Sequence, residues 1–140
     1  MLAQLGEARV EVKGVRTGTR IGTIATKSSD QEIELLVYNY NETDDDLTIS
    51  DQVIIQVSGL PDGEYSVEKY RLDREHNNTY RAWQKQGSPK TSKDADLNNL
   101  KKAAELTTTH SAKKQSADGE MRLNLPLPRH SMMLIKIRSY

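Results

Sequence analysis

A stretch near the middle of the chain changes from strand-like to helix-like composition. Residues 65–72 read as a strand that breaks at Asp73, and the chain then turns into a short helical run that carries the only tryptophan, Trp83. Gly87 and Pro89 follow at the spacing that typically ends a helix. Because the segments on both sides have the pattern of short strands separated by turns, the sequence predicts a mainly β chain with a helical insertion between two strands.

The strand pattern predicts the fold class. Residues 32–40 are the strongest candidate, because apolar side chains occupy both faces, as in a central strand that is covered on both sides. Residues 120–127 alternate cleanly between apolar and polar. The other candidates are 9–13, 20–27, 52–57 and 131–138. Several strands spaced by turns, with strands at both ends, predict an immunoglobulin-like antiparallel β-sandwich.

Two pairing features are predicted around the turn at residues 59–63. Pro61 followed by Asp62 and Gly63 is a turn signal, which favours a hairpin between residues 53–57 and 65–72. The strand at 65–72 changes phase, because Tyr65 and Val67 share one face and Tyr70 and Leu72 the other. This change predicts a bulge, or a second half covered from the opposite side by the following helix.

The helical insertion is expected to span about residues 73–106 and to contain two helices. Asn77 or Asn78 is positioned to cap the first helix, and Tyr80 shares a face with Trp83. The second is predicted at 93–106, with a capping box formed by Thr91 and Asp94. The polar residues 107–118 are predicted to be a loop. Packing of Tyr80 and Trp83 on Tyr70 and Leu72 is favoured over a sugar-binding platform.

Composition narrows the classes of partner. The 140 residues fit one domain, and 20 basic residues balance 20 acidic ones, which argues against a nucleic-acid or anionic-membrane surface as the main partner. The apolar runs are too short to cross a bilayer, and residues 1–6 lack the pattern of a signal peptide. Cytoplasmic and secreted locations both stay open.

The sequence predicts no catalytic residue, no metal and no cofactor. His76, His110 and His130 are scattered, without a carboxylate at metal-binding spacing. The acidic run 44–46 lacks the glycine and the distal glutamate of a calcium loop, which favours a solvated loop. No nucleophile elbow and no glycine-rich phosphate loop are present in the sequence.

Residues 70–89, YRLDREHNNTYRAWQKQGSP, resemble a segment of glycoside hydrolase family 39, which is best known for bacterial β-xylosidases. The flanking segments 34–39, 59–65 and 127–131 have counterparts in the same family. The resemblance extends from about Leu2 to Arg138.

The resemblance implies which part of such an enzyme this chain represents. In the family a (β/α)8 barrel carries both catalytic carboxylates of a retaining mechanism, and a β-sandwich follows it. A barrel needs about 250 residues, so only the sandwich fits here, and no catalytic residue is carried over. The resemblance implies that residues 1–6 end the last barrel helix and that residues 7–140 form a non-catalytic C-terminal accessory domain of a β-xylosidase.

The resemblance also implies partners. In oligomeric members the helix-bearing loop is associated with subunit contacts and with the approach to the active site. The interface or active-site-approach candidates here are Asp73, Glu75, His76, Tyr80 and Trp83. The expected partners are the catalytic barrel and neighbouring subunits, with Val10 and Val12 as further candidates for barrel contact and xylo-oligosaccharides as a weaker expectation. The resemblance leaves the parent's substrate open between xylosides, iduronides and other glycosides.

Two alternatives come from other classes of protein. One is a carbohydrate-binding module that acts alone, and the other is an immunoglobulin-like interaction domain unrelated to glycosidases. Binding of xylo-oligosaccharides to the isolated chain separates the carbohydrate module from the accessory domain.

Overall fold

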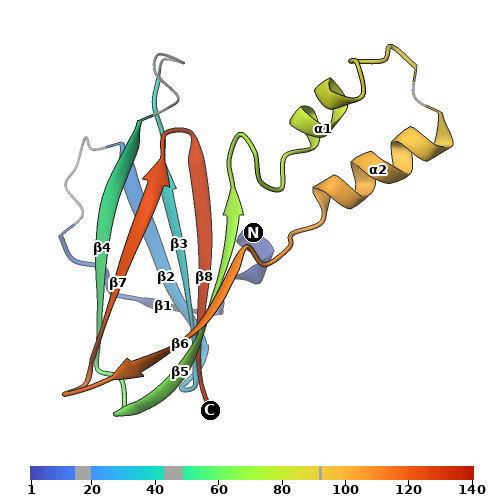
Figure 1. Cartoon of the computed structure of the whole chain (residues 1–140). Helices are drawn as coiled ribbons and strands as arrows, with labels where there is room; N and C mark the ends of the chain where they lie inside the picture. The colour runs from blue at the N-terminus through green and yellow to red at the C-terminus, as the bar shows by residue number, and fades with distance from the viewer. Residues whose placement is uncertain (15–19, 43–48, 92) are drawn as a thin grey trace.

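Two antiparallel sheets and a two-helix arm make up the molecule (Figure 1). The computed structural model describes residues 1–14, 20–42, 49–91 and 93–140. The larger sheet has the strand order β1-β2-β3-β8-β5-β6, and the smaller sheet consists of β4 and β7. The strands are β1 (Ala8–Val10), β2 (Ile21–Ser29), β3 (Glu32–Asn39), β4 (Ser50–Ser58), β5 (Gly63–Leu72), β6 (His110–Ser116), β7 (Glu120–Pro128) and β8 (Ser131–Ser139). The predicted sandwich with a helical insertion is confirmed.

The core lies between the two sheets. On β7 the alternation predicted from the sequence places Met121, Leu123, Leu125 and Leu127 inward, and all four are buried. They face the buried inner residues of the large sheet, which include Leu35, Val37, Met133, Ile135 and Ile137. The inner apolar faces of β7 and of the central strands of the large sheet are therefore buried, as the period of two requires.

The predicted hairpin between residues 53–57 and 65–72 is wrong. β4 pairs with β7, whereas β5 pairs with β6 and β8 in the other sheet. Between β4 and β5 the chain crosses from one sheet to the other, where Leu60 is buried and the Tyr65 hydroxyl donates to the carbonyl of Pro61 at 2.9 Å. A turn sequence specifies a local change of direction, but it does not specify that the flanking strands pair with each other.

Residues 107–118 contain a strand rather than only a loop. β6 pairs with β5 from Gly63↔Ser116 to Lys69↔His110 and forms one edge of the large sheet. Most of its side chains are exposed, so the strand lacks the apolar alternation by which sequence patterns are recognised.

The phase change in β5 needs no bulge. Its pairing with β8 is continuous from Tyr65↔Ser139 to Leu72↔Met132. Tyr70 and Leu72 lie on the outer face of the sheet, but the following helix does not cover them, because Leu72 stays 41% exposed. The explanation by a bulge or by a covering helix is therefore wrong.

The N-terminal segment lies against the outer face of the large sheet. After the short 3-10 helix η1 (Leu2–Gln4), the backbone N–H of Gly6 donates to Thr26 Oγ1 at 2.8 Å and to Glu34 Oε2 at 3.2 Å. Lys136 Nζ donates to Gln4 Oε1 at 2.7 Å. A side chain at position 6 would collide with the backbone of Lys27, so only glycine fits this approach.

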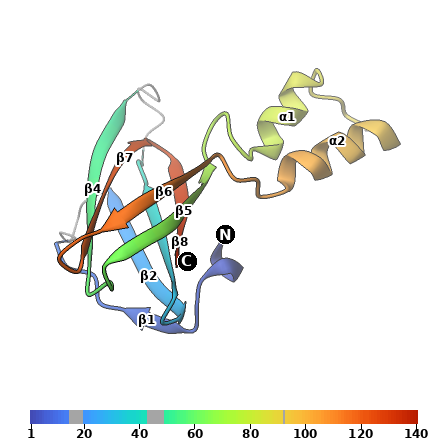
Figure 2. The same cartoon turned by 60° about the horizontal axis from the view of Figure 1, so that its bottom comes forward.

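The arm consists of α1 (Thr79–Lys85) and α2 (Asp94–Ala104). The two helices pack on each other and extend away from the sandwich (Figures 1 and 2). α2 begins after Lys93, whose backbone N–H donates to Asp96 Oδ2 at 3.4 Å, so the predicted capping box of Thr91 and Asp94 is wrong by its position. Among the described residues, none of the helices has the length and apolar character needed to cross a membrane.

Candidate functional site

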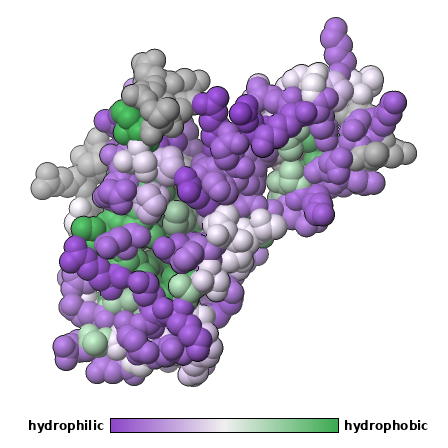
Figure 3. All heavy atoms as spheres, viewed as in Figure 1, coloured by the Kyte–Doolittle hydropathy of each residue, from purple (hydrophilic) through white to green (hydrophobic). Residues whose placement is uncertain are grey.

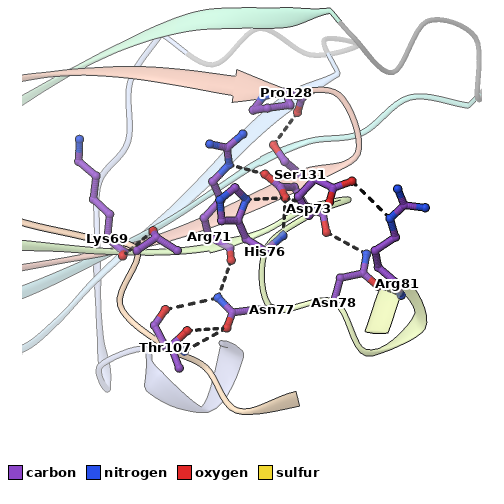
Figure 4. A network of polar contacts seen from close by, with 12 residues as sticks. Lys69, Arg71, Asp73, His76, Asn77, Asn78, Arg81, Thr107, Pro128 and Ser131 are labelled. Atoms are coloured by element: carbon purple, nitrogen blue, oxygen red, sulfur yellow. Dashed lines mark hydrogen bonds and ion pairs between the residues drawn. The ribbon is translucent and has the colours of Figure 1, made fainter. Parts of the chain in front are cut away.

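Asp73 is the centre of a polar network at the base of the arm (Figure 4). Its side chain is only 6% exposed. Oδ1 accepts hydrogen bonds from the backbone N–H groups of Glu75 and His76, both at 2.8 Å, and lies 2.9 Å from His76 Nδ1. Oδ2 forms an ion pair with Arg71 Nε. Asp73 therefore ends β5 and fixes the turn that leads into the arm.

The charge state of Asp73 follows from these contacts. Burial by itself raises the pKa of a carboxyl group, but the hydrogen bonds from His76 and from the two backbone N–H groups, together with the Arg71 charge, hold the pKa of Asp73 below its ordinary value. A general acid or base that works near neutral pH needs a pKa near that pH. The network therefore makes Asp73 a structural anion rather than a proton donor.

Two asparagines attach both ends of the arm to the sandwich. Asn77, with a positive φ of 50°, donates from Nδ2 to the carbonyl of Arg71 at 2.7 Å. Its Oδ1 accepts from the backbone N–H of Thr107 at 3.1 Å. Asn78 donates from Nδ2 to the carbonyl of Asp73 at 2.8 Å and caps α1 by accepting from the N–H of Arg81 at 3.0 Å. The capping predicted for this pair is confirmed at Asn78.

Tyr80 and Trp83 stack on each other, as their shared helical face predicts, with ring centroids 5.5 Å apart. Trp83 is half-buried and donates from Nε1 to the carbonyl of Pro89 at 3.1 Å, whereas Tyr80 is 63% exposed. The predicted packing of this pair on Tyr70 and Leu72 is wrong, because α1 lies away from β5 and packs against α2 instead. The aromatic pair belongs to the arm itself.

An open groove of about 560 Å³ lies beside this network, and we call it the arm-base groove. It is bounded by the end of β5, the turn after it, the first part of α1 and the turn between β7 and β8. Its lining residues are Arg71, Leu72, Asp73, Arg74, Glu75, His76, Asn78, Tyr80, Arg81, Gln84, Pro128, Arg129 and His130. The structure therefore brings four of the five candidates, Asp73, Glu75, His76 and Tyr80, to one groove.

The groove does not have the arrangement of a glycosidase active site. Such a site needs two carboxyl groups on opposite sides of a reacting bond. Asp73 is held by its hydrogen bonds, and Glu75 lies 3.4 Å from Arg81 Nε and 3.8 Å from Lys85 Nζ. Within the described ranges, no cluster of three or more potential metal ligands is found. The acidic run 44–46 lies outside the described residues.

The outer face of the large sheet carries two apolar rows, which we call the outer platform. The register places Leu36, Leu134 and Tyr70 in one row and Tyr38, Met132 and Leu72 in the next, across β3, β8 and β5. Leu36 and Leu134 are buried, whereas Tyr38 and Leu72 are exposed. Local sequence patterns show apolar residues on both faces of these strands, but only the strand order shows that they form one surface.

A second groove, of about 790 Å³ and largely apolar, opens between β4 and the side of the large sheet formed by β1 and β2. Val10 and Val12, which were expected to contact a barrel together with the arm, line this groove and not the arm-base groove. In Figure 3 hydrophobic atoms gather on the body of the sandwich, whereas most of the arm surface is hydrophilic. The structure therefore does not bring the two valines and the aromatic pair together.

Comparison with known proteins supports the fold. No family model matches the sequence, and no curated protein does. Among solved structures, the chain is similar to a glycoside hydrolase family 39 enzyme from Xanthomonas axonopodis pv. citri, with a TM-score of 0.70 and 15% identity over 84% of this chain and 26% of that one. It is also similar to a monomeric β-xylosidase from Caulobacter crescentus CB15, with a TM-score of 0.64 and 20% identity over 83% of this chain and 26% of that one.

A bacterial orthologue of human α-L-iduronidase has the same fold in part, with a TM-score of 0.65 and 16% identity over 86% of this chain and 22% of that one. The chain thus spans about a quarter of the length of these enzymes. At these identities the likeness shows a shared fold.

Proposed function

We propose that the chain is the C-terminal β-sandwich accessory domain of a family 39 glycoside hydrolase and is itself non-catalytic. The observation that carries this proposal is the asymmetry of the structural match, in which 84% of this chain corresponds to 26% of a complete enzyme. The resemblance of residues 70–89 to the family supports it independently. Because an unrelated interaction domain can have the same fold, the parent protein has to be tested directly.

We infer that the outer platform contacts the barrel. An exposed apolar surface of this kind marks a contact site in many proteins, and burying a large apolar side chain stabilises a contact by about 1.5–3 kcal/mol. Tyr38 and Leu72 supply the exposed part of this surface. The N-terminal segment lies on the same face, through Gly6 and Gln4, so a barrel that precedes it would reach the platform over a short distance.

The barrel contact is tested by expressing this chain and the upstream barrel as separate polypeptides and measuring their complex by size-exclusion chromatography. Leu72→Asp is expected to abolish the complex. Ile54→Asp is the matched control, because Ile54 is 58% exposed on β4 of the other sheet. A complex that survives Leu72→Asp, or that Ile54→Asp weakens equally, would place the contact elsewhere.

We propose that the arm contacts a neighbouring subunit or the approach to the active site of the parent. The projection of both helices from the sandwich supports this role, because it places the surface of the arm within reach of a second chain. In the full-length parent, Trp83→Ala is expected to disturb assembly or thermal stability more than kcat. A variant that assembles normally but has lost kcat would assign the arm to the active site instead.

We further propose β-xylosides as the parent's substrates, which the barrel hydrolyses. The Caulobacter crescentus neighbour, a β-xylosidase, supports this choice. Release of xylose from xylo-oligosaccharides by the complete parent tests it, and selective activity on iduronides would overturn it while leaving the accessory role intact.

A further inference from the structure

Arginines dominate the arm-base groove, although the whole chain has no net charge. Four arginines line it, against the two carboxylates of Asp73 and Glu75. Arginine guanidinium groups bind carboxylates through two parallel hydrogen bonds, so a groove of this composition favours an anionic ligand with planar acceptor geometry.

Arg71 is held in a fixed orientation. Its Nε forms an ion pair with the buried carboxylate of Asp73, and this contact keeps the guanidinium group, whose side chain is 26% exposed, beside the groove. In Figure 4 the Arg71 side chain lies beside the Asp73 carboxylate, and both residues line the groove. Its two terminal nitrogens form no hydrogen bond with the described residues, and they remain as donors for a ligand. An orientation fixed in advance lowers the entropic cost of binding.

Arg74 adds a second cation at the same groove. Its side chain is exposed, and it has neither an ion pair nor a hydrogen bond with any residue that the structure describes. Arg81, by contrast, is engaged with Glu75 and with Gln84, to which its Nη1 donates at 3.4 Å. Arg71 and Arg74 are therefore the groups that a carboxylate ligand would meet.

The rest of the groove suits a sugar ring. Tyr80 lines it with a ring that is mostly exposed and is held in place by stacking on Trp83. Aromatic faces offer apolar contact at low entropic cost, and a volume of about 560 Å³ lies in the range of small-ligand sites. We propose that the arm-base groove binds a uronic-acid sugar, with its carboxylate on Arg71 and Arg74 and its ring against Tyr80.

This site goes beyond the proposed accessory role and does not depend on it. The test is a titration of the ¹⁵N-labelled chain with xylotriose that carries one glucuronic acid substituent, and in parallel with unsubstituted xylotriose. The acidic sugar is expected to give saturable shifts at residues 71–76 and to bind at least about tenfold more tightly than the neutral sugar, because hydrogen bonds between charged groups are the strong ones.

Arg74→Gln is expected to weaken binding of the acidic sugar about tenfold. It is preferred over Arg71→Gln because the exposed Arg74 makes no described contact whose loss would unfold the turn. Arg122→Gln is the matched control, since Arg122 is exposed on β7 and does not line the groove. Equal thermal midpoints of the two variants establish that both are folded.

Three results would overturn the inference. The first is equal affinity for the acidic and the neutral sugar, or no saturable shift with either. The second is a loss in Arg122→Gln as large as that in Arg74→Gln, which would indicate a diffuse charge effect. The third is a hexaglutamate peptide that binds as tightly as the acidic sugar, which would make the groove a contact for protein carboxylates.

Discussion

Replacement of Asp73 by asparagine is expected to loosen the arm from the sandwich. The native carboxylate accepts three hydrogen bonds, from two backbone N–H groups and from His76, and it is paired with Arg71. The asparagine side chain has only one oxygen that can accept hydrogen bonds. Its NH2 group, which is a donor, must therefore face either Arg71 or the two backbone N–H groups, which are donors as well. One side of the network is therefore lost in either orientation.

The magnitude follows from the burial of this network. A hydrogen bond to a charged group contributes about 1.5–3 kcal/mol, and breaking a fully buried ion pair costs about 3–5 kcal/mol. Because the Arg71 side chain is partly exposed, the lower part of this range applies. We expect Asp73→Asn to lower the free energy of unfolding of the arm by about 2–3 kcal/mol.

The assay uses the position of the only tryptophan. Trp83 lies in the arm, so its fluorescence in urea reports the arm, while amide hydrogen exchange in the central strands β3 and β8 at the same urea concentrations reports the sandwich. Glu75→Gln is the matched control, because the exposed pairs of Glu75 at 3.4 Å and 3.8 Å contribute less than about 1 kcal/mol. If Asp73→Asn shifts the fluorescence transition no more than Glu75→Gln does, the network does not hold the arm.

One further prediction concerns the pH dependence of Asp73, and two concern other parts of the structure. The pKa of Asp73 is lower in the folded chain than in the unfolded chain, so its contribution to stability is complete above the unfolded pKa of about 3.9 and is lost as the pH falls through the folded pKa. The urea midpoint of the wild type should therefore fall more steeply below pH 4 than the midpoint of Asp73→Asn. Parallel plots of urea midpoint against pH for the two proteins would contradict this prediction. Gly6→Ala should release the N-terminal segment from the sheet, since the new Cβ would lie 2.3 Å from the Lys27 carbonyl carbon. We expect faster amide hydrogen exchange at residues 1–6 in this variant. Unchanged exchange would refute the close approach of Gly6 to Lys27. Leu125→Ala should lower the free energy of unfolding in urea by about 2–5 kcal/mol, because Leu125 is completely buried. A decrease of less than about 1 kcal/mol would show that the core around Leu125 is loosely packed.

Elements with strong local signals were predictable from the sequence. The alternation in 120–127 gave the buried face of β7 correctly, and the cap at Asn78 and the stop at Gly87, with φ of 84°, follow from residue chemistry that acts within one turn of chain. The shared face of Tyr80 and Trp83 is equally local.

Features that depend on strand order were not predictable. The outer platform requires that β3, β8 and β5 are neighbours, although they are distant in the chain. The wrong hairpin prediction has the same cause. Whether β4 pairs with β5 or with β7 depends on which pairing buries the whole apolar face of β4 against the rest of the core, and a local turn sequence does not contain this information. The Asp73 network was predicted only as a group of candidate residues, since the role of Arg71 as partner depends on where β5 ends.

If this chain is one domain of a larger glycosidase, as we propose, the gene that encodes it must also encode the rest of the enzyme. The decisive measurement is the sequence of the native polypeptide upstream of Met1. We expect a (β/α)8 barrel of about 250 residues that carries two catalytic glutamates. A native polypeptide with no such barrel would rule out the accessory role and would favour a module that acts alone.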